Sequence, residues 1–135
     1  MKKKNVLPIP LEYDDQCSIF TFAQVMAATN QNPDLKMLWA SLNGVRLTIG
    51  QAVKAKKAGM KKGYPDIGLD VARGGYHGLR IELKREKGGR LEPEQKEWLQ
   101  DLAEYGYFAC VCRGANAAKL VLINYLRGEY ETRSE

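Results

Sequence analysis

The chain has 135 residues, which is enough for one domain with a hydrophobic core and too few for two independent domains. Hydrophobic residues make up 44% of it and charged residues 27%, which excludes a disordered chain, and no apolar stretch approaches the ~18 residues of a membrane helix. The formal charge of +5 favours a polyanionic partner such as nucleic acid, although solubility alone explains so small an excess equally well.

Cysteine usage and the N-terminus indicate the compartment. The three cysteines are odd in number and have no CxxC spacing, so they indicate neither a disulfide framework nor a zinc site, and the basic N-terminus has no apolar stretch behind it. We therefore expect a protein of the reducing cytoplasm, neither secreted nor membrane-spanning. We expect one domain over residues 1–135, with an ordered core from about 11 to 127.

The first half of the chain predicts two helices with a strand between them. Asp14 or Asp15 can cap a helix that runs to about Thr29, because apolar residues follow at helical spacing. Residues 36–43 are typical of a short strand, and residues 48–58 of a second, lysine-rich helix that a glycine closes.

The second half predicts a hairpin followed by a helix, a strand and a helix. Residues 67–72 and 79–84 resemble two strands joined by a glycine turn. A helix from Pro93 to Gly106, a strand at 108–112 and a helix at 115–127 complete the chain. Because a helix between two strands implies a parallel pair, we expect an α/β fold with a mixed four-stranded sheet flanked by helices.

The hairpin carries a cluster of charges. Side chains alternate along a strand, so Glu82 and Lys84 share one face, and a hairpin centred on Gly74 places Asp66 opposite Glu82. Two like charges at ~5 Å are destabilising unless something offsets them. A divalent cation can do so, with Asp66, Glu82 and the backbone carbonyl of Leu83 as hard oxygen ligands.

Lys84 completes the elements of a phosphodiester-cleaving site, because its cation can orient the attacking water or stabilise the charge on the phosphate. Glu-x-Lys on its own is common on a solvated strand face and carries little information. Its combination with Pro65-Asp66, a hairpin spacing and the lysines just upstream favours the catalytic interpretation.

Five segments of the chain, in sequence order, form a specific combination. They are Gln16 in the first helix, LNG at 42–44, KKGYPDIGL at 61–69, GYHGLRIELKR at 75–85 and LEPEQKEWLQDLAEYGY at 91–107. Together they resemble the VRR-NUC domains of the PD-(D/E)XK nuclease superfamily, in their compact stand-alone phage or prophage form. The resemblance extends from about Leu11 to Leu126.

The resemblance implies a restriction-endonuclease-like core and a metal-dependent DNA endonuclease. In such an enzyme Asp66 and Glu82 bind Mg²⁺ or Mn²⁺, and Lys84 assists catalysis. It also implies a homodimer that acts on duplex DNA or on branched DNA such as Holliday junctions, in the bacterial host cytoplasm if a phage encodes the chain. The alternatives are a non-catalytic nucleic-acid-binding module with this fold and an interaction protein whose acidic pair is structural.

Two glutamines are further candidates for the site. Many superfamily members bring an acid from the first helix to the metal, whereas the matching position here holds Gln16, with Glu12, Asp14 and Asp15 nearby. Gln16 either offers its carbonyl oxygen to the metal or is a polar first-turn residue. Gln95 lies on the sheet-facing side of its helix, where it either holds a catalytic water or the scissile phosphate, or makes an ordinary helix-start hydrogen bond.

The lysine-rich segment before Asp66 is either a solvated helix face or an edge that contacts DNA phosphates, and its nearness to the acidic pair favours the second. The expected DNA contacts are Lys54, Lys57, Lys61, Lys62, Tyr64 and Arg85, with Arg73 as a further candidate. His77 can contact DNA or act as a base, although a lone loop histidine is more often a surface residue. Trp39 and Trp98 are expected in the core.

Overall fold

The computed structural model describes residues 11–41, 43 and 47–132, and it has the predicted order of helices and strands. The helices are α1 (Leu11–Ala28), α2 (Ile49–Lys57), α3 (Pro93–Glu104) and α4 (Ala115–Leu126). The strands are β1 (Leu38–Ala40), β2 (Ile67–Leu69), β3 (Leu79–Lys84) and β4 (Phe108–Arg113), and a 3-10 helix, η1 (Pro33–Met37), precedes β1. None of the helices in these described ranges is long and apolar enough to cross a membrane.

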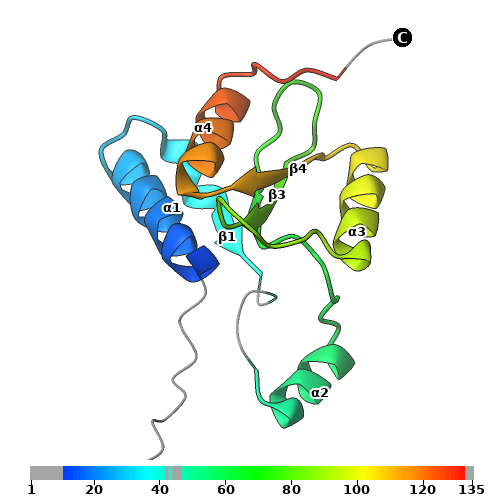
Figure 1. The fold of residues 1–135 in the computed structure, drawn as a ribbon. Helices are drawn as coiled ribbons and strands as arrows, with labels where there is room; N and C mark the ends of the chain where they lie inside the picture. The colour runs from blue at the N-terminus through cyan, green and yellow to red at the C-terminus, as the bar shows by residue number, and fades with distance from the viewer. Residues whose placement is uncertain (1–10, 42, 44–46, 133–135) are drawn as a thin grey trace, which may run out of the picture.

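The sheet is mixed and four-stranded, as predicted, with its strands in the order β1-β2-β3-β4 (Figure 1). Strands β3 and β4 are parallel, and α3 is the crossover between them. Strands β1 and β2 also have a helix between them, yet they are antiparallel, so the expectation of a parallel pair is wrong there. Helix α2 has no buried residue and stands apart from the sheet, so it cannot serve as a crossover that packs on a sheet face (Figure 1).

Two of the predicted starts are wrong. Helix α1 already includes Leu11, so Asp14 and Asp15 lie inside it and do not cap it, because nothing between Leu11 and Asp14 opposes a helix. In the predicted strand 36–43, the first two residues belong to η1, which Pro33 begins.

The pairing between β1 and β2 limits the length of both strands. Strand β2 ends at Leu69, three residues before the predicted end, and each of its residues pairs with one residue of β1. Strand β1 is therefore limited to Leu38–Ala40. Within the LNG segment, Leu42 and Gly44 lie outside the described residues.

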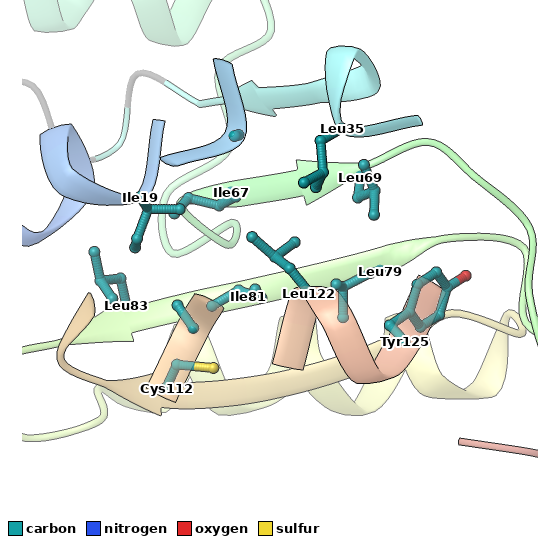
Figure 2. Close-up of a cluster of buried hydrophobic side chains, with 12 residues drawn as sticks. Ile19, Leu35, Ile67, Leu69, Leu79, Ile81, Leu83, Cys112, Leu122 and Tyr125 are labelled. Carbon is teal, nitrogen blue, oxygen red and sulfur yellow. The ribbon is translucent and has the colours of Figure 1, made fainter. Parts of the chain in front are cut away.

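The hydrophobic core lies between one face of the sheet and the helices α1 and α4 (Figure 2). Ile19 of α1 and Leu122 and Tyr125 of α4 are fully buried against this face. The sheet side chains they cover are those of Ile67, Leu69, Leu79, Ile81 and Leu83. Burial of each such side chain stabilises the fold by about 2 kcal/mol. The other face of β3 lies under α3 and is chemically different.

Candidate active site

The hairpin register brings the two acidic residues together. Strand β2 pairs with β3 through Ile67 with Ile81 and Gly68 with Arg80, which is the register predicted for a hairpin centred on Gly74. The next pair along this register is Asp66 and Glu82, and their carboxyl groups lie close enough for each to affect the pKa of the other. Because neighbouring side chains alternate, this pair lies on the face opposite the core.

Asp66 is held by both neighbouring strands. Its Oδ2 accepts a hydrogen bond from the backbone N–H of Leu83 at 2.8 Å, and its own carbonyl accepts one from Ser41 at 2.8 Å. Burial raises the pKa of Asp66, and the Leu83 N–H and the Lys84 cation oppose that rise. Because the N–H and C=O of a residue leave an antiparallel strand on the same side, the Leu83 carbonyl is directed toward this carboxylate as well.

Glu82 is the most deeply buried acid of the site, with 3% of its surface exposed. Its Oε1 accepts a hydrogen bond from Nε2 of Gln95 at 2.7 Å and lies 3.8 Å from Nζ of Lys84. Its Oε2 is buried and has no hydrogen-bond partner among the described residues. Burial and, second, the charge of Asp66 raise the pKa of Glu82 to about 8, although Lys84 opposes them.

This donor set fits a hard divalent cation. The available ligands are the carboxylates of Asp66 and Glu82 and the Leu83 carbonyl, and Glu82 offers a buried oxygen that no donor in the described part of the chain satisfies. In the described ranges no three His, Cys, Asp or Glu side chains form a metal-binding group, so such a cation would keep several waters. Mg²⁺ is commonly held in this way, by one or two carboxylates together with water and a substrate phosphate.

Gln95 combines the helix-start bond expected of it with a contact to the acidic pair. Its Oε1 accepts the backbone N–H of Glu92 at 2.8 Å, which caps the start of α3. Its Nε2 donates to Glu82 Oε1 at 2.7 Å. The side-chain amide of Gln95 therefore holds α3 against the sheet and orients the Glu82 carboxylate through Oε1, so that this contact does not occupy Oε2.

The first helix brings one acid, Glu12, near the site. Glu12 and Gln16 are one turn apart and in line with the core residue Ile19, so all three lie on the sheet-facing side of α1. The charge of Glu12 contributes to the raised pKa of Asp66, whereas Gln16 is half-buried between Glu12 and the core. This alignment exists because α1 begins earlier than Asp14.

Comparisons with known proteins identify the family of the chain. The family model described as VRR-NUC domain matches residues 9–116. The chain belongs to the VRR-NUC domain family. A solved structure titled "VRR_NUC domain protein" is 31% identical to it with a TM-score of 0.70, over 87% of this chain and 88% of that one. No curated protein matches the chain.

Membership in the VRR-NUC family makes the fold a nuclease-type α/β core of the PD-(D/E)XK class. The order of the predicted segments agrees with this assignment. The match spans the hairpin with Asp66, Glu82 and Lys84 and the start of α3 with Gln95. Fold and family are thereby established, and the chemistry follows from the site.

The VRR-NUC site contains one buried cation that the sequence analysis did not identify. Arg80 precedes Glu82 by two residues, so it lies on the same face of β3, and only 7% of it is exposed. Its guanidinium carbon lies 5.0 Å from the ring centre of Trp39 and 4.6 Å from that of Tyr107. The alternation of side chains along the strand, which placed Glu82 and Lys84 on one face, could also have predicted that Arg80 lies on that face.

The two tryptophans expected in the core lie outside it, on the site face. Trp39 packs over Gly68, where any Cβ would collide with its ring, and stacks on Tyr64 with ring centres 6.3 Å apart. Trp98 meets the edge of Tyr64 at 5.1 Å. Both tryptophans are only half-buried, since the sheet-facing core is already filled by α1 and α4.

The predicted DNA contacts surround this site to different degrees. Lys54 and Lys57 of α2 are exposed, as are Lys61, Lys62 and Arg85. Lys62 forms a 3.5 Å ion pair with Glu94, and the Tyr64 hydroxyl accepts a hydrogen bond from Arg80. Arg73 instead pairs with Asp34 and binds the Leu126 carbonyl, far along the chain from the site. His77 is an exposed loop residue at the opposite end of β3 from Lys84.

Proposed function

We propose that this VRR-NUC domain is a divalent-metal-dependent DNA endonuclease. The observation that carries the proposal is the buried Glu82 carboxylate, which faces Asp66 and keeps one oxygen without a partner among the residues that the structure describes. A purely structural acid at this depth would have both oxygens paired. The same carboxylate lies beside Lys84, the cation that a phosphodiester-cleaving site needs.

The residues divide the chemistry between them. Asp66, Glu82 and the Leu83 carbonyl would hold Mg²⁺ or Mn²⁺, which supplies an acidified water and neutralises charge on the phosphate. Lys84 orients the attacking water and stabilises the negative charge that develops on the phosphate oxygens. Gln95 holds the Glu82 carboxylate in place and is available to the water or the scissile phosphate. Gln16, one turn beyond Glu12 on α1, would act only through the cation's water shell.

DNA binding would use the exposed cations next to this site. Lys54 and Lys57 extend along α2, and Lys61, Lys62 and Arg85 lie closer to Asp66 and Lys84 in the chain. Such lysines bind phosphates regardless of sequence and lose affinity as salt rises. The resemblance to stand-alone VRR-NUC domains favours branched DNA and a homodimer. A dimer is also physically sensible, because two coordinated cuts need two sites.

The test is cleavage of labelled four-way junction, flap and linear duplex DNA in Mg²⁺, Mn²⁺ or EDTA. We expect cleavage that needs the metal, that is lost in Glu82→Gln and that favours the junction. Glu97→Gln is the matched control, because Glu97 is an exposed residue of the same helix as Gln95 and the substitution is chemically identical.

Two outcomes would contradict the proposal. Tight DNA binding without cleavage in either metal would leave a nucleic-acid-binding module with a nuclease fold. Equal cleavage by wild type and Glu82→Gln would place the active site elsewhere. Equal cleavage of all three substrates would contradict only the preference for branched DNA.

A further inference from the structure

The chain between α2 and Asp66 is held by side chains from distant parts of the sequence. We call residues 61–64 the linking segment. Nδ2 of Asn43 donates to the carbonyls of its first and last residues, at 3.0 and 3.3 Å. Nε1 of Trp98 donates to the carbonyl of Lys62 at 3.1 Å, and Gly63 packs against Glu94 at the start of α3 with φ of +82°. The path of this segment is therefore determined by its surroundings.

Arg80 fixes the end of the linking segment. Its Nε donates to the hydroxyl of Tyr64 at 3.0 Å, and its Nη1 lies 3.2 Å from Oδ1 of Asp70. The planar guanidinium contacts the rings of Trp39 and Tyr107. Because the fork is planar and also bonded to Tyr64 and Asp70, it cannot turn without losing these contacts, so the Tyr64 hydroxyl has a rigid donor.

Only one residue separates this anchor from the acidic pair. Pro65 lies between Tyr64 and Asp66, and it is fully buried. Its ring fixes its own φ, and it restricts the backbone of Tyr64 to extended conformations. Few backbone torsions between Tyr64 and Asp66 are free to change, so a displacement of Tyr64 also displaces Asp66.

We propose that Arg80 is a positioning residue for the metal-binding carboxylate of Asp66, acting through the Tyr64 hydroxyl. The inference rests on the proposed function, since it concerns the geometry of the same cation site. Arg80 itself touches neither the carboxylate pair nor the scissile phosphate in this mechanism. Its role is to keep Asp66 at the distance from Glu82 that one cation can bridge.

The experiment compares two tyrosine-to-phenylalanine variants by calorimetric titration with Mn²⁺ alone, without DNA. Tyr64→Phe removes the hydroxyl that Arg80 holds and keeps the ring between Trp39 and Trp98. Tyr107→Phe is the matched control, because it removes a hydroxyl from another tyrosine whose ring contacts the same guanidinium. We expect Tyr64→Phe to bind Mn²⁺ about tenfold more weakly than wild type, and Tyr107→Phe to bind like wild type.

Arg80→Lys is the second variant, since lysine keeps the charge but cannot form the same fork to Tyr64. Arg80→Lys should weaken Mn²⁺ binding as Tyr64→Phe does. Because both substitutions remove the same hydrogen bond, the double variant should bind Mn²⁺ no more weakly than the weaker-binding of the two single variants. Melting temperatures measured without metal separate this effect from unfolding: Tyr64→Phe should melt close to Tyr107→Phe.

The proposal is overturned if Tyr64→Phe binds Mn²⁺ as tightly as Tyr107→Phe, or if the effects of Tyr64→Phe and Arg80→Lys simply add. It is also overturned if Mn²⁺ affinity falls only in proportion to a lower melting temperature. Failure of the proposed function has a different signature. Wild type would then bind no Mn²⁺, or Glu82→Gln would bind Mn²⁺ as tightly as wild type.

Discussion

The two faces of β3 are equally buried and chemically opposite. The apolar face consists of Leu79, Ile81 and Leu83, none more than 3% exposed, and the polar face of Arg80, Glu82 and Lys84, none more than 9% exposed. Burial of the first face removes apolar surface from water and drives folding. Burial of the second face removes charges from water, which costs free energy unless each charge finds partners.

The partners on the polar face are incomplete. Among the described residues, Arg80 has aromatic rings and three oxygen acceptors, whereas Glu82 has one satisfied oxygen and one without a partner. Burial and the charge of Asp66 raise the pKa of Glu82 to about 8. Deep burial on this strand therefore means stability on one face and, under the proposed function, a position for a cation on the other. Substitutions on the two faces should separate these contributions.

The largest expected effect is on catalysis, at the polar face. Asp66→Asn keeps an oxygen for the Leu83 N–H but removes the charge that a cation needs. We expect the cleavage rate to fall by about 10³-fold or more, with little change in melting temperature, because metal catalysis contributes several kcal/mol to the transition state. The matched control is Asp101→Asn, an exposed position on α3. A rate within a few-fold of wild type would exclude Asp66 from the site.

The apolar face should show the converse. Ile81→Ala leaves a cavity under α1 and α4, and we expect it to lower the free energy of unfolding by about 3 kcal/mol in a denaturant titration. Val111→Ala, which lies beside Glu82 on the site face of the sheet and is 38% exposed, should cost well under half of that. An Ile81 variant as stable as the Val111 variant would mean that this face is not the core.

The pH dependence of stability should distinguish Glu82 from the residues around it. Its pKa in the folded protein, about 8, lies above its ordinary value of 4.5, so the folded state holds a proton that the unfolded state releases. Without divalent metal, this contribution to stability is complete below pH 4.5 and is lost as pH rises to about 8. Glu82→Gln should therefore melt higher than wild type at pH 8.5, by about 5 °C, and the difference should shrink toward pH 5.

Two further measurements sharpen this prediction. Mg²⁺ or Mn²⁺ should raise the melting temperature of wild type at pH 8.5 and leave that of Glu82→Gln nearly unchanged, because a cation replaces the proton. A difference between the two proteins that stays constant from pH 5 to 8.5 would contradict a raised pKa at Glu82.

The smallest expected effect concerns the lysines outside the sheet. Lys54→Ala and Lys57→Ala should weaken DNA binding at all sequences and each reduce the slope of log affinity against log salt by about one. Lys36→Ala is the control, since Lys36 is an exposed cation of η1, on the α1 side of the molecule. If all three variants show the same salt dependence of DNA affinity as wild type, then α2 is a solvated helix that does not contact DNA.

The order of elements, the hairpin register and the grouping of Asp66, Glu82 and Lys84 could be predicted from the sequence, because they depend on local information. Strand phase places alternate residues on one face, and a glycine-centred turn determines which residues of the two strands pair. The resemblance of five segments to VRR-NUC domains also predicted the family, which the family model confirms.

The remaining features depend on packing between distant segments. The antiparallel pairing of β1 with β2, the position of the tryptophans outside the core and the hydrogen bond from Gln95 to Glu82 all join residues far apart in the chain. Whether a buried polar atom is satisfied is decided only when every neighbour is in place, so the free oxygen of Glu82 and the enclosure of Arg80 are properties of the tertiary structure alone.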